Sequence, residues 1–130
     1  MRSVQLPAKS QSAATVLLGA ARCWRRARDA AAPIQPALSC ELASRDCVVL
    51  APVLDSLMRF YEAALGRPMA TGDGNRPSED EMTLIGLLDG GRTRACLGCP
   101  ERAARALDCA LCSTRIMLAL ACPPTLGALQ

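Results

Sequence analysis

The chain of 130 residues contains no histidine. Histidine is the commonest general base and the commonest metal ligand in proteins, so its absence excludes Ser-His and Cys-His nucleophile systems. The sequence also lacks a cofactor-binding loop and an isolated pair of reactive polar residues. These absences favour a binding or regulatory protein over an enzyme.

Aromatic residues are also scarce, at 2% of the chain, although hydrophobic residues make up 51%. Alanine and leucine, which are strong helix formers, supply much of the apolar content. Residues that favour strands are few. The composition therefore predicts an all-α fold. Lys9 is the one lysine among fifteen basic residues, and this arginine bias is typical of a GC-rich bacterial gene.

Charge of one sign does not dominate, because the formal net charge is +3. A nucleic-acid-binding domain normally has a denser basic face or a higher pI. The densest basic stretch surrounds Trp24 and consists of Arg22, Arg25, Arg26 and Arg28. Such arginines could contact phosphates, but the pattern is more typical of a solvated helix face beside a core tryptophan. We therefore expect no nucleic-acid partner.

No stretch is apolar for the ~20 residues that a membrane-spanning helix requires. The short apolar run at residues 14–21 is followed by basic residues, whereas a signal peptide has its positive charge before the apolar stretch. We therefore expect no membrane partner and a cytoplasmic location. In that compartment, thiols are mostly reduced.

Hydrophobic periodicity and turn residues predict one helical domain over residues 12–122, with tails at 1–11 and 123–130. The domain is expected to be a compact bundle of four to five helices with short Pro/Gly-rich connections. The expected elements are helices at 12–32, 35–43, 51–65, 78–88 and 100–121, and a short strand-like run at 47–50.

Capping residues fix several of these boundaries. Pro52 suits the first turn of a helix, and Gly66 suits its C-terminal cap. Ser78 and Glu81 match a capping box, in which each side chain accepts a hydrogen bond from the other residue's backbone N–H. The acidic residues at 79–81 favour the same helix start through the helix dipole. Met82 is expected on the buried side of this helix.

The sharpest chemical motif is a pair of CxxC sequences, formed by Cys96 with Cys99 and by Cys109 with Cys112. Four thiolates can bind one structural zinc ion as a closed tetrahedron. A continuous helix from Pro100 opposes this hypothesis, because ten helical residues separate Cys99 from Cys109 by ~15 Å. Zinc ligands must lie within ~4 Å of one another.

The alternative interpretation places Cys109, Cys112 and Ile116 along one helix face as structural, buried residues, since buried free cysteine behaves as a small hydrophobe. Cys99 has a further possible role, because the N-terminus of a helix favours a reactive thiolate.

The sequence thus favours a non-enzymatic protein-binding or regulatory module without a cofactor. Its partner surface is expected to be a remaining apolar helix face or the arginines near Trp24, and self-association is equally compatible. The rival hypothesis is a zinc-stabilised module built on Cys96, Cys99, Cys109 and Cys112, and an enzyme that uses Cys99 as nucleophile is a more distant third.

Overall fold

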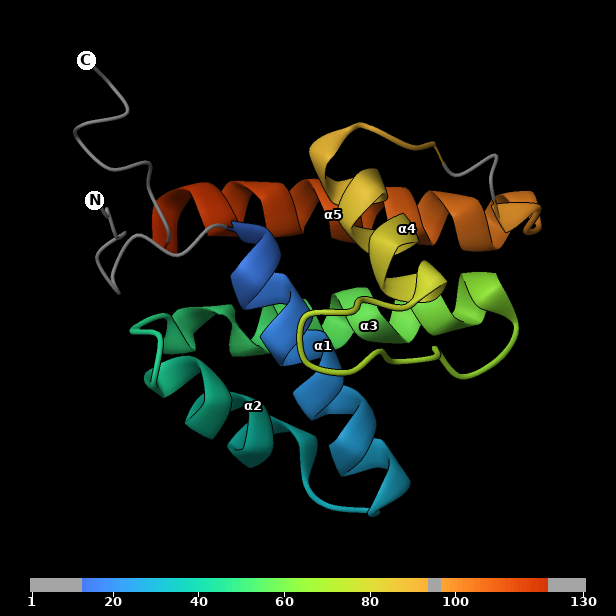
Figure 1. The fold of residues 1–130 in the computed structure, drawn as a ribbon. Helices are drawn as coiled ribbons and strands as arrows, with labels where there is room; N and C mark the ends of the chain where they lie inside the picture. The colour runs from blue at the N-terminus through green and yellow to red at the C-terminus, as the bar shows by residue number, and fades with distance from the viewer. Residues whose placement is uncertain (1–12, 94–96, 122–130) are drawn as a thin grey trace, which may run out of the picture.

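Five α-helices and one 3-10 helix form the regular structure of residues 13–93 and 97–121, the ranges that the computed structural model describes (Figure 1). They are α1 (Ala13–Asp29), α2 (Ile34–Ala43), η1 (Val48–Leu50), α3 (Ala51–Leu65), α4 (Glu79–Asp89) and α5 (Glu101–Ala121). The prediction of an all-α bundle with four to five helices is confirmed. The tails predicted at 1–11 and 123–130 lie outside the described residues.

The predicted caps of α3 and α4 are confirmed. Pro52 lies in the first turn of α3, and Gly66 ends that helix with a left-handed φ of 74°. At the start of α4, the Glu81 backbone N–H donates to Ser78 Oγ at 3.0 Å, and the Ser78 N–H donates to Glu81 Oε1 at 2.8 Å. Gly90 ends α4 with a φ of 86°. These boundaries follow from local backbone chemistry, which is why the sequence predicts them.

Two predicted elements differ from the structure. The helix expected to reach residue 32 ends at Asp29, because Ala31 adopts a φ of 54° and the Ala32 N–H bonds back to the Ala27 carbonyl. The strand-like run at 47–50 instead forms the 3-10 helix η1, in which the Leu50 N–H donates to the Cys47 carbonyl. This run leads directly into α3 and buries Leu50.

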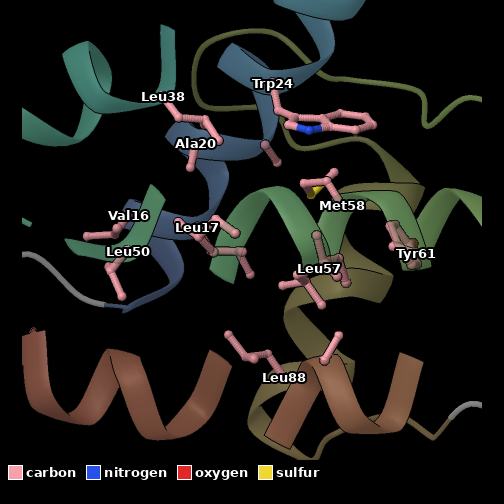
Figure 2. Packing of buried hydrophobic residues seen from close by; sticks show 14 of the residues in the cluster. Val16, Leu17, Ala20, Trp24, Leu38, Leu50, Leu57, Met58, Tyr61 and Leu88 are labelled. Carbon is pink, nitrogen blue, oxygen red and sulfur yellow. The ribbon is translucent and has the colours of Figure 1, made fainter. Parts of the chain in front are cut away.

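Helix α3 lies at the centre of the bundle and contacts α1, α2, η1 and α5, while α4 packs against α1 and α5. Figure 2 shows the core where these helices meet, with Leu17, Leu57 and Met58 between them. Burial of such a side chain contributes about 1.5–3 kcal/mol to folding. Met82, which was expected in this core, is instead 43% exposed on α4.

Each of the two buried aromatic side chains donates a hydrogen bond through its own polar group. Trp24 is 1% exposed, and its indole Nε1–H donates to Asp55 Oδ1 at 2.8 Å. The Tyr61 hydroxyl donates to the Asp80 backbone carbonyl at 2.6 Å. Burial raises the pKa of Tyr61, so this hydroxyl stays protonated and can keep donating. None of the helices in the described ranges is long and apolar enough to span a membrane.

Candidate functional site

Of the four motif cysteines, the structure describes Cys99, Cys109 and Cys112, and Cys99 does not meet the other two. Helix α5 is continuous from Glu101 to Ala121, as the sequence predicts, and carries Cys109 and Cys112. Cys99 lies two residues before it, and the helical rise from Glu101 to Cys109 alone is ~12 Å. Cys96 lies outside the described residues. Among the described residues, no group of three or more histidine, cysteine or acidic side chains is arranged to hold a metal ion.

The alternative interpretation of these thiols as buried is wrong for α5. Cys109 and Cys112 are both exposed, and Ile116 is 56% exposed. Helix α5 has apolar residues on two sides. The side without Cys109, Cys112 and Ile116 packs on the bundle. The buried residues of α5 are Ala104, Leu107, Ala110, Leu111, Thr114 and Leu118.

The solvent-facing side of the C-terminal half of α5 forms an exposed apolar stripe. We call this stripe the outer α5 face and define it by Cys109, Cys112, Ile116, Ala119 and Leu120, all of which are exposed. Leu120 is 73% exposed, more than any other large hydrophobic side chain in the described ranges. Figure 1 shows α5 along one edge of the molecule.

Residues 109–121 contain a single charged side chain, Arg115, and that guanidinium bonds within the molecule. Its Nε and Nη2 donate to the backbone carbonyls of Leu88 and Leu87, each at 2.8 Å. These carbonyls belong to the last turn of α4, where a cation interacts favourably with the helix dipole. The interaction links α5 to α4 and directs the Arg115 guanidinium toward α4.

A shallow hollow of about 250 Å³ adjoins this face between the start of α1, the end of α4 and α5. Leu88 and Leu118 contribute apolar lining, and Asp89 and Arg115 contribute polar groups. Ala119 borders both the hollow and the outer α5 face. Small-molecule sites usually enclose about 300–1,000 Å³, so the hollow is better matched to a single side chain.

The arginines around Trp24 are largely engaged in intramolecular contacts. Arg22 donates through Nε and Nη2 to the two carboxylate oxygens of Glu81, at 2.8 and 3.1 Å. Arg25 pairs with Glu62 and with Asp29. Arg25 and Arg28 also lie over the Trp24 ring, with their guanidinium carbons 5.5 and 5.2 Å from its centroid. These pairings reduce the positive charge that a phosphate backbone would meet.

Glu81 is the most completely buried charged side chain among the described residues, at 1% exposed. Besides Arg22, its Oε1 accepts the backbone N–H groups of Gly72 and Ser78, at 3.0 and 2.8 Å. Burial alone would raise the pKa of Glu81, but the hydrogen bonds from Arg22, Ser78 and Gly72 outweigh it and hold the pKa below its ordinary value. The carboxylate therefore fastens the 66–78 loop and α4 to α1, which is a structural role.

Asp80 makes a second attachment of the same loop. Arg67 donates to both of its carboxylate oxygens, at 2.6 and 2.8 Å, and the Ala70 N–H donates to Oδ2 at 2.8 Å. The hydrogen bond from Arg67 is the main cause that lowers the pKa of Asp80. The sequence accounts for Asp80 and Glu81 only as first-turn residues of a helix, and it gives no indication of their arginine partners.

Cys23 and Cys99 have separate environments. Cys23 is buried in α1, its Sγ lies 3.4 Å from the Ala37 carbonyl oxygen, and burial raises the pKa of its thiol. Cys99 is half-buried and packs against the core just before α5.

Comparison with protein-family models, curated proteins and solved structures finds no match to this chain.

Proposed function

We propose that the protein is a non-enzymatic helical module that binds a protein partner through the outer α5 face. The observation that carries this proposal is the continuous stripe of exposed apolar side chains on a helix whose opposite side is buried in the bundle. Isolated exposed hydrophobic residues are normal on protein surfaces, whereas a contiguous group of them is typical of an interaction site.

The chemistry of the stripe indicates the chemistry of the partner. Ile116 and Leu120 offer aliphatic contact, and the one nearby cation, Arg115, is bonded to carbonyls of α4. An uncharged, apolar helix face fits such a surface, in the way that amphipathic helices pack through residues spaced three and four positions apart. A nucleic acid or an acidic surface finds no unpaired cation along residues 109–121.

The polar clusters of the described residues support the non-enzymatic part of the proposal. The buried carboxylates of Asp80 and Glu81 are each occupied by an arginine and by backbone N–H groups. Both groups stabilise the loop at 66–78, and all four of their carboxylate oxygens accept hydrogen bonds from within the molecule.

Photo-cross-linking tests the proposal. A benzophenone-bearing amino acid replaces Leu120 in one variant and Met82, which is 43% exposed on α4, in the control. Both variants are irradiated as purified protein and in the source cell. We expect protein adducts from position 120 and none from position 82. Equal adducts from both positions, or none from position 120 in either setting, would contradict the proposed function.

A further inference from the structure

We propose that the partner on the outer α5 face is a second copy of this chain, packed antiparallel along α5; this inference rests on the proposed function. Its starting point is the spacing of the exposed residues. Cys109, Cys112, Ile116 and Ala119 follow one another at intervals of three, four and three residues. This is the a/d spacing with which one helix packs along another.

In the antiparallel register centred on Thr114, the stripe is complementary to itself. Cys109 then lies opposite Ala119 of the second copy, and Cys112 lies opposite Ile116. Each layer combines a small side chain with one of equal or larger size. Because the two chains are related by a twofold axis, each pairing occurs twice. A twofold interface requires such self-complementarity, because each chain contributes the same surface patch.

Charge selects the antiparallel direction. The same spacing continues towards the start of α5 through Arg105 and Arg102, both of which are exposed. In a parallel pair each of these arginines would face its own copy, and like charges opposite each other oppose association. In the antiparallel register both lie opposite positions beyond Ala121, the last residue of α5. The neutral half of one helix therefore meets the neutral half of the other.

The size of the surface predicts a weak complex. The stripe from Cys109 to Leu120 covers about three helical turns, which offers less than the roughly 800 Å² that each partner buries in a stable complex of standard size. We therefore expect a weak, reversible dimer. Asp108 and Arg115 flank the stripe, and Arg115 is held on α4 away from the contact.

The first test measures the mass of the purified full chain by sedimentation equilibrium, with reductant present, up to about 500 µM. We expect a monomer–dimer equilibrium. Ile116→Arg places a charge at the centre of the contact and should weaken dimerisation at least tenfold. Met82→Arg adds the same charge at an exposed apolar position on α4 and should leave the dissociation constant unchanged within about twofold.

The second test measures direction and register. Ala119→Cys places a thiol opposite Cys109 of the second copy, and oxidised glutathione serves as the oxidant. We expect an interchain disulfide between positions 109 and 119, mapped by peptide mass, and its loss when Cys109→Ser is added. An interchain disulfide between two Cys109 residues would show parallel packing and overturn the proposed direction.

A monomer at every concentration would overturn the second copy as the occupant. The photo-cross-link from position 120 then tests the proposed function independently of the dimer. An adduct of another mass would leave the proposed function intact with a different protein partner. An intrachain product with residues 122–130 would show that the chain covers this face itself, and both proposals would fall.

Discussion

Replacing Glu81 by glutamine removes one buried negative charge and keeps the size of the side chain. The Glu81 side chain is 0% exposed and that of Arg22 is 16% exposed, so solvent screens their interaction weakly. The glutamine carbonyl oxygen can still accept the N–H groups of Gly72 and Ser78. Its amide NH₂ must then face the Arg22 Nε–H, which places two donors against each other. Breaking a buried pair in this way costs about 3–5 kcal/mol.

The free energy of unfolding measures this cost. Trp24 is the sole tryptophan and is 1% exposed, so its fluorescence follows denaturant unfolding directly. Glu79→Gln is the matched control, because Glu79 lies in the same helical turn and its side chain is 81% exposed in its ion pair with Arg92. The control should change stability by less than about 1 kcal/mol.

A double-mutant cycle separates the pair from its surroundings. In the Glu81→Gln background, Arg22→Met should cost much less than it does alone, because the charge that Arg22 neutralised is gone. Equal costs in the two backgrounds, or a Glu81→Gln variant within 1 kcal/mol of the wild type, would refute the view that this ion pair holds the loop and α4 to α1.

The same carboxylate predicts a dependence on pH. The folded-state pKa values of Asp80 and Glu81 are lowered. Their contribution to stability is therefore complete above the ordinary carboxyl pKa values, about 4, and is lost as the pH falls through the lower folded-state values. Unfolding measurements between about pH 7 and pH 3 should show this loss. Glu81→Gln should have a shallower slope, and an unchanged slope would contradict the assignment.

Three further substitutions test the backbone and the α4–α5 contact, each by denaturant unfolding. Gly66→Ala should destabilise by about 1 kcal/mol, since the φ of 74° strains any residue with a Cβ while no atom within 4 Å would meet it. Gly19→Ala should stabilise by about 0.5 kcal/mol, because alanine has the higher helix propensity. The new Cβ would lie 2.7 and 2.8 Å from the side-chain ends of Glu41 and Arg45, which must move away. The resulting loss of ion-pair energy should be smaller than the gain. Arg115→Met should cost about 1.5–3 kcal/mol, because two charged hydrogen bonds to α4 are lost; a cost below 0.5 kcal/mol would show that Arg115 does not anchor α5.

Sequence reasoning succeeds here where structure is decided within a few residues. The caps at Ser78 and Gly66 depend on local hydrogen bonds and on the sign of φ, and both are visible as residue types. It fails at the ion pair between Arg22 and Glu81, which lie 59 positions apart. No local pattern marks which of several arginines meets which carboxylate, since only the packing of α1 against α4 brings these two together.

Helix α5 shows why the candidate surface could not be assigned from periodicity. Its sequence carries apolar residues on two sides, one with Leu107 and Leu118 and one with Ile116 and Leu120. Either side has the period of an amphipathic helix, and the choice of side depends on what α3 and α4 present to it. In the structure, α5 packs mainly against α3 with Leu118 directed inward, and the bonds from Arg115 to the Leu87 and Leu88 carbonyls hold it on α4 as well. The side left outside carries both thiols, Ile116 and Leu120, and it is therefore a consequence of tertiary packing.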